Sequence, residues 1–184
     1  LEDAGHEIGC HTFDHANLME LSNAEIRAQF SRNQTFFGEL RGGARFNSFA
    51  YPFGNVSPKV KKETQKHYPI CRGVWSGLNV GTIDMALLST IGLDHSLTQE
   101  QLDDWISRAI TENGWLTFTA HDIRDDHSPH GISPAHYASV VETVAKSGIK
   151  VLPICEAAAL AVGDPSLTPE MNASSEGGSK SAAA

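Results

Sequence analysis

The sequence has few of the features that would place it in several large classes of protein. Its 184 residues carry 14 Lys and Arg against 22 Asp and Glu, a formal net charge of −8, whereas nucleic-acid binders show a basic stripe. No apolar run approaches the roughly 20 residues that a membrane-spanning helix needs. Cysteine is scarce, and the three residues Cys10, Cys71 and Cys155 are too few and too widely spaced for a fully paired disulfide framework or a Cys-x-x-Cys motif. The length and the 40% hydrophobic content indicate one domain with a packed core.

Histidine, in contrast, is plentiful, with nine residues. It is the commonest metal ligand in proteins and the side chain that titrates nearest neutral pH. Metal binding and acid–base catalysis are therefore the first functions to look for.

The two ends of the sequence differ from its middle. Leu1 to Gly5 reads as the last turn of a helix that a glycine ends, so we expect the chain to be the C-terminal part of a longer protein. From Gly163 onward the sequence is rich in Ser, Gly, Ala and Glu, which predicts a disordered tail. We therefore expect a folded unit over residues 1–162 and a tail over residues 163–184.

Helix and strand signals alternate between these ends. Helices are predicted from Ser22 or Asn23 to about Leu40, from Ser57-Pro58, from Thr98 to about Glu112, from Ser133-Pro134 to Lys146 and from Glu156 to Ala161. Strands are predicted over residues 6–11, 46–51, 70–75, 87–93, 115–120 and 149–154. Such alternation with short connections indicates parallel βα units, whose catalytic residues follow the carboxyl ends of strands.

The first such group is a His-x-x-x-His pair, His11 and His15. On one face of a helical turn, two imidazoles at this spacing can reach one zinc ion. Cys10 is expected to point to the opposite side, because side chains alternate along a strand. Among nine histidines the same spacing also arises by chance, and the pair alone does not decide between the two readings.

Two further strand ends carry polar or turn residues. The sequence FAYPFG at 49–54 is a proline-fixed turn that can aim the backbone N–H of Phe53 at a developing oxyanion. His121, followed by Asp122, ends the run LTFTAH at 116–121, and can serve as a general acid or as a ligand that a carboxylate orients. Taken singly, these features also fit an ordinary turn and a surface loop.

Together the three segments resemble the polysaccharide deacetylase family (the NodB homology domain, carbohydrate esterase family 4). The run GHEIGCHTFDH at 5–15 is similar to the family's zinc-binding His-Ser/Thr-x-x-His motif, FAYPFG to its third motif, and LTFTAH to its last motif. Their order and their spacing by helices also fit, and the resemblance covers about residues 1 to 160.

The resemblance implies an α/β fold, part of a distorted (β/α) barrel, and the hydrolysis of N-acetyl or O-acetyl groups on a glycan such as chitin, peptidoglycan or an exopolysaccharide. His11 and His15 would hold a divalent metal, zinc first, with an Asp completing the set. The N–H of Phe53 would help to hold the oxyanion, and His121 would protonate the leaving amine. A secreted or cell-envelope location follows from the family alone.

The sequence also departs from the family pattern. The Asp-Asp pair of the first motif, which supplies a base and a metal ligand, is missing, and Asp125-Asp126 follows the last motif instead of opening the domain. The third motif usually has an Arg where this chain has Ala50, and the Asp-x-x-Asp-Trp motif is absent. Arg72, on a strand near the site, is a candidate to orient a carboxylate in place of that Arg. We therefore expect the 184-residue chain to be nearly inactive.

Two other functions stay open: a hydrolase of small non-peptide amides on the same scaffold, and a glycan-binding pseudoenzyme that has lost the Asp pair. The aromatic residues Tyr51, Phe53 and Trp75 are candidates for stacking on sugar rings, with core packing as the alternative role. An acetylated glycan is the expected partner, and neither nucleic acid nor a membrane span is expected. The glycan, the metal and the oligomeric state are not specified by the sequence.

Overall fold

The computed structural model describes residues 4–168. Its five α-helices are α1 (Asn23–Leu40), α2 (Pro58–Thr64), α3 (Gln99–Thr111), α4 (Pro134–Lys146) and α5 (Ile154–Val162). Its four short strands are β1 (Ser48–Ala50), β2 (Ile70–Arg72), β3 (Ile91–Gly92) and β4 (Phe118–Thr119). Three 3₁₀ helices are also present: η2 (Leu18–Glu20), η3 (Pro52–Gly54) and η4 (Pro165–Leu167).

The helices begin where the capping signals place them. Ser22 caps α1 through a reciprocal capping box with Glu25, and Thr98 does the same for α3 with Gln101. Both α2 and α4 start with a proline in the first turn after a serine cap. The predicted helices are therefore confirmed, with the last one starting two residues earlier than expected, at Ile154.

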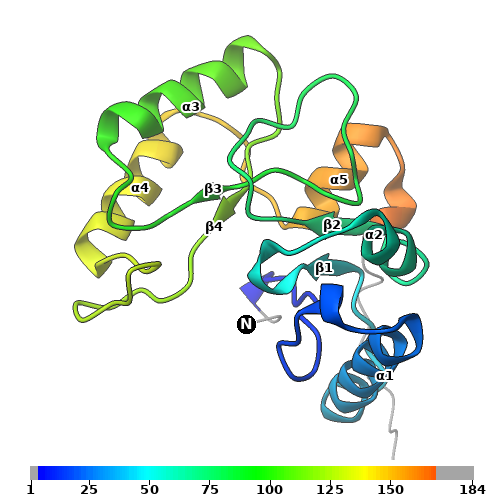
Figure 1. Ribbon diagram of the computed structural model, residues 1–184. Coiled ribbons are helices and arrows are strands. Elements are labelled where there is room, and N and C mark those ends of the chain that lie inside the picture. Colours follow the sequence, from blue (N-terminus) through cyan, green and yellow to red (C-terminus); the bar gives the residue numbers. More distant parts are fainter. Residues whose placement is uncertain (1–3, 169–184) are drawn as a thin grey trace, which may run out of the picture.

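All strand pairs of the two sheets are parallel. Phe49 of β1 pairs with Cys71 of β2, and Ile91 of β3 pairs with Phe118 of β4. Single bridges extend the first sheet on both sides, from Cys10 to Phe49 and from Arg72 to Leu88. Figure 1 shows the resulting arrangement, with α1 and α2 beside the first sheet and α3 and α4 beside the second. The α/β class is confirmed, while the described residues do not close into a barrel.

Two predicted strands do not form as expected. Residues 149–153 have no strand partner among the described residues, and residues 6–11 contribute only the bridge at Cys10. Both segments are apolar enough to be predicted as strands, but a strand also needs a neighbouring strand with which to form hydrogen bonds. Both segments instead line a cavity between the two sheets. The strand predicted over residues 87–93 is longer than the observed strand, β3, which covers only Ile91 and Gly92. Leu88, in the same predicted segment, forms a single bridge to Arg72 of β2.

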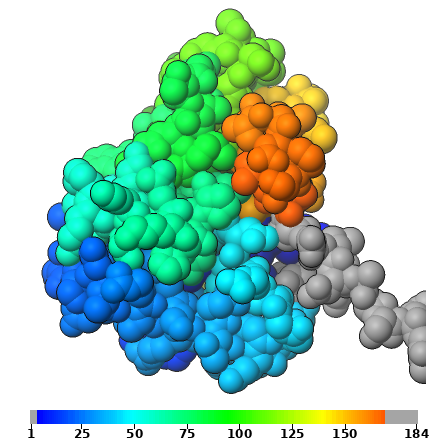
Figure 2. Space-filling model, turned by 90° about the vertical axis from the view of Figure 1, so that its right-hand side faces the viewer, coloured from blue at the N-terminus to red at the C-terminus, as the bar shows by residue number. Residues whose placement is uncertain are grey.

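The core is built around aromatic side chains in the N-terminal half. Phe49 is buried and lies against the rings of Phe30, Tyr51 and Tyr68, with centroid separations of 5.2 Å for each pair. A second cluster fills the space between β3, α3 and α4, and a third joins β2 to α5. Figure 2 shows α5 (orange) on the surface, between the green upper half of the molecule and its blue and cyan lower half.

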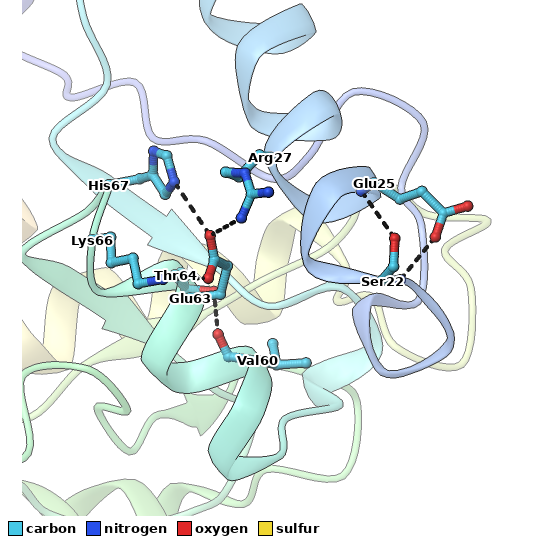
Figure 3. Close-up of polar contacts among 8 residues, drawn as sticks. All are labelled: Ser22, Glu25, Arg27, Val60, Glu63, Thr64, Lys66 and His67. Carbon is cyan, nitrogen blue, oxygen red and sulfur yellow. Dashed lines mark hydrogen bonds and ion pairs between the residues drawn. The ribbon is translucent and has the colours of Figure 1, made fainter.

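A buried carboxylate joins α1 to α2. Glu63 is 2% exposed and accepts hydrogen bonds from Arg27 at 3.0 Å and Lys66 at 2.6 Å, as Figure 3 shows. These two bonds, first that from Lys66 and then that from Arg27, lower the pKa of Glu63. The carboxylate is therefore ionised at neutral pH and links the two helices by charge as well as by hydrogen bonds.

The end of the described chain continues past α5. Gly163 ends this helix in the left-handed conformation, and Leu167 of η4 packs against the cluster around α5. The remainder of the predicted tail, residues 169–184, lies outside the described residues, as do residues 1–3 of the predicted N-terminal helical turn. Within residues 4–168 no helix is long and apolar enough to cross a membrane, and all three cysteines are free and buried.

Candidate metal centre and active site

His11 and His15 lie side by side. Their ring centroids are 4.8 Å apart, with an angle of 66° between the ring planes. His11 Nδ1 is 2.8 Å from the carbonyl oxygen of Ala50, and because that oxygen can only accept, Nδ1 carries the hydrogen. The other nitrogen of His11 is therefore a free acceptor, which is the state that a metal ligand needs.

The turn that joins the two histidines is not the helical turn that their spacing suggests. Thr12 has φ 65° and His15 has φ 54°, so both residues are in the left-handed region that non-glycine residues seldom adopt. Phe53, whose ring centroid is 4.5 Å from that of His15, has φ 59°. Three of the four non-glycine residues with positive φ in the described part of the chain thus gather at one place. Backbone strain of this kind, about 1–3 kcal/mol for each residue, is typical of functional sites.

The pKa of His11 is lowered from its ordinary value. Burial is the largest cause, and the neighbouring positive charges of His15, Arg72 and His121 contribute, while the bond to Ala50 opposes the shift. The lowered pKa keeps the imidazole neutral near pH 7 and available to a metal. His11 and Arg72, which come from two different segments, line the same cavity.

The turn at 51–54 presents one aromatic residue and buries another. Phe53 is 60% exposed, and its backbone N–H has no hydrogen-bond partner within residues 4–168, as an oxyanion donor requires. Tyr51 is 1% exposed, and its hydroxyl donates to the carbonyl oxygen of Ala86 at 3.0 Å. The ring of Tyr51 thus has no free face for a sugar, and its role in this structure is core packing.

Trp75 remains available as a substrate contact. Its side chain is 65% exposed, and Val74 beside it contacts the turn that carries Phe53, at Gly54. The backbone of Trp75 is held, because its carbonyl accepts a hydrogen bond from the N–H of Thr90 at 2.9 Å. The segment 74–75 therefore lies beside the turn whose exposed residue, Phe53, contacts His15, and Phe53, Val74 and Trp75 all have exposed apolar side chains.

Arg72 ends β2 and lines a cavity of about 830 Å³ together with His11. Burial lowers the pKa of its guanidinium. The only hydrogen bond that the guanidinium makes within residues 4–168 is a long one, 3.4 Å, to the carbonyl of Gly73. The rest of the cavity lining comes from the segment 4–10, from β1, from α3, α4 and α5 and from the segments 114–118 and 149–154, and it includes the polar residues His6, Glu7, Ser48 and Lys150 beside many apolar ones. A guanidinium so placed has room for an anionic partner inside the cavity.

His121 follows β4 and is exposed. Asp122, the predicted orienting carboxylate, instead binds the N–H and hydroxyl of Ser128 at 2.8 and 2.7 Å and lies 3.3 Å from Arg124. The neighbour of the His121 ring is His130, at a centroid distance of 5.6 Å. Nothing in the sequence indicates that the loop after Asp122 folds back and brings His130 beside His121.

The residues present fit part of a metal centre. Two imidazoles converge, but residues 4–168 contain no group of three or more His, Cys, Asp or Glu side chains that could hold a metal ion. Asp14, which stands between the two histidines in the sequence, is turned away and bound to Gln29 and Arg32 at 2.9 and 2.6 Å. A complete site would need at least one further ligand, as the missing Asp pair already indicates.

Residues 1–68 match the polysaccharide deacetylase family. A chitooligosaccharide deacetylase of Azorhizobium caulinodans is 34% identical over 62 residues, which are 34% of this chain and 30% of that protein. The chain thus spans less than a third of this curated relative. These matches confirm the resemblance to the family over residues 1–68, which hold the segments 5–15 and 49–54, while the segment 116–121 lies outside the family match.

Solved structures extend the likeness in fold over most of the chain. The CE4 domain of a multidomain xylanase from the hindgut metagenome of Trinervitermes trinervoides aligns with a TM-score of 0.54 at 13% identity, over 88% of this chain and 67% of that one. A mutant of a CE4 family pseudoenzyme from Bacillus anthracis aligns with a TM-score of 0.50 at 21% identity, over 84% of this chain and 48% of that one.

Proposed function

From the match of residues 1–68 to polysaccharide deacetylases, we propose that this chain is the larger part of a metal-dependent hydrolase that removes acetyl groups from a glycan. The observation that carries the proposal is the convergence of His11 and His15, whose ring centroids are 4.8 Å apart, with the ring of Phe53 beside that of His15. A glycan substrate is consistent with a secreted or cell-envelope location.

Each residue has a distinct role in the proposed reaction. His11 and His15 hold the metal, which supplies Lewis-acid activation of the acetyl carbonyl and of water. The free N–H of Phe53 holds the carbonyl oxygen as it gains negative charge. His121 delivers a proton to the departing amine, which is a poor leaving group without one. Trp75 contacts the sugar, because its ring is exposed and its neighbour Val74 lies against this turn.

The base and the third metal ligand are proposed to come from a segment outside residues 4–168. The 830 Å³ cavity is bordered by residues 5–11 and 149–154, two extended segments with unpaired edges, and His11 and Arg72 lie in its wall. An added strand that ends in carboxylates would fill the cavity and place an anion beside Arg72, which then orients it. The relatives support this proposal, since they are longer than the part matched here.

The test is acetate release from N-acetylated chitooligosaccharides with added zinc. The 184-residue chain should release acetate far more slowly than a complete homologous domain, because the base is missing, and a fusion that restores an Asp-Asp strand should raise the rate. In that fusion, His121→Ala should lower kcat, while His136→Ala, in α4, should leave it unchanged. Comparable rates for the chain alone and a complete domain would contradict the proposal.

A second function, a glycan-binding pseudoenzyme, is favoured by one observation: within these 184 residues no Asp pair stands where the family's first motif has one, because the pairs at 103–104 and 125–126 follow the histidine segment. The similarity in fold to a CE4 family pseudoenzyme agrees with it. Binding of oligosaccharides without acetate release, even in the fusion, would support this function. Release from small non-peptide amides but not from acetylated sugars would instead support an amide hydrolase on the same scaffold.

A further inference from the structure

Glu7 contacts two parts of the chain that the proposed reaction does not use. Its Oε1 accepts hydrogen bonds from the hydroxyl of Ser48 and from the thiol of Cys155, the latter at 3.1 Å. Its Oε2 accepts the backbone N–H of Cys155 at 2.8 Å. One half-buried carboxylate therefore joins the segment before His11 to β1 and, across a sequence separation of 148 residues, to α5.

For α5 these contacts replace a missing cap. The helix follows Pro153, which makes no side-chain capping hydrogen bond, and the first N–H groups of a helix have no partner within it. Glu7 supplies the acceptor, and a negative charge at this end of a helix is favourable. Burial, and then the nearby carboxylate, raise the pKa of the Cys155 thiol, which therefore stays protonated as a donor.

The same contacts also fix the register of the segment that carries His11 relative to β1. The N–H of Cys10 donates to Ser48, and the N–H of Ala50 donates to Cys10, each at 2.9 Å. Glu7 holds Ser48 at one end of this short ladder, and His11 holds Ala50 at the other. A slip by one residue would exchange the faces of His11 and Cys10, turning the imidazole away from the site.

We propose that Glu7 is a positioning residue that sets the register of the segment carrying His11 and couples it to the docking of α5. Its carboxylate is directed at Ser48 and Cys155, and within residues 4–168 it forms no metal-binding group with the His11–His15 pair. The effect on metal binding rests on the proposed function, whereas the effect on His11 and α5 does not.

The experiment compares Glu7→Ala, Glu7→Gln and Ser48→Ala with the control Glu39→Gln, an exposed glutamate of α1. Three readouts are taken well below the melting temperature of each variant: zinc affinity by competition with a chromophoric chelator, the ring ¹⁵N signals of His11, and amide exchange in α5. Glu7→Ala should lower zinc affinity roughly tenfold, as expected when a residue that orients a ligand is lost.

Glu7→Ala should also remove the Nδ1–H signature of His11 and speed exchange at the Cys155 amide. Glu7→Gln, which keeps one acceptor oxygen, and Ser48→Ala should change the three readouts in the same direction but by less. If Glu7→Ala does not fold, these two variants are compared with the wild type instead. The control should match the wild type. Folded variants with unchanged His11 signals, or with unchanged α5 exchange, would overturn the proposal. If neither the wild type nor the fusion that restores the Asp-Asp strand binds zinc, the proposed function fails, and the other two readouts still decide the role of Glu7.

Discussion

Gly54 tests how the turn beside the candidate site is held. It has φ +68°, and a Cβ at this position would lie 2.1 Å from Cγ2 of Val74 and 3.1 Å from its Cβ and Cγ1. Gly54→Ala therefore adds a left-handed backbone cost of about 1–2 kcal/mol to an overpacking cost of about 1–3 kcal/mol. Because valine is stiff and its whole side chain is close, rotation cannot relieve the contact.

A matched glycine separates the two costs. Gly81 has φ +66°, but a Cβ there would meet no atom within 4 Å, so Gly81→Ala should lose only the backbone part, about 1–2 kcal/mol. The assay is the free energy of unfolding from urea titration. Val74→Ala in the Gly54→Ala background should recover the difference between the two glycine variants. Equal losses for Gly54→Ala and Gly81→Ala, or no recovery with Val74→Ala, would refute this account of the turn.

Two further predictions concern buried polar groups. Tyr51→Phe should cost about 1 kcal/mol of unfolding free energy, because the carbonyl of Ala86 loses its donor, and should leave glycan binding intact; weaker binding with unchanged stability would restore Tyr51 as a substrate contact. Glu63→Gln should be destabilising at neutral pH. Because bonds from Lys66 and Arg27 lower the pKa of Glu63 in the folded state, its contribution is present above the unfolded pKa and is lost as pH falls through the folded one. The difference between variant and wild type in urea titrations should therefore shrink on acidification, and a constant difference would contradict this.

Local signals were sufficient to predict the helices. Each capping box, Ser22–Glu25 and Thr98–Gln101, spans only four consecutive residues. The local sequence is therefore sufficient to predict where α1 and α3 begin. Strands needed partners that sequence does not show. The segment 149–154 is apolar and borders the cavity, but it has no neighbouring strand within residues 4–168, and its last residue instead starts α5.

The candidate site could be predicted in its members but not in its geometry. The His-x-x-x-His spacing correctly brought His11 and His15 together, yet through left-handed residues and not through a helical turn. Trp75 is exposed and Tyr51 is buried because of packing between segments that are distant in the sequence, which the local sequence does not show. Glu7 gave no signal of its own, because its partners lie 41 and 148 residues away.

The most direct test of the central claim is a zinc titration of the 184-residue chain followed by the ring ¹⁵N signals of all nine histidines. The account predicts that His11 and His15 shift together at the lowest zinc concentrations, and that His15→Ala abolishes the shift of His11. Zinc binding that first shifts His121 and His130, or that leaves His11 and His15 unchanged, would contradict it.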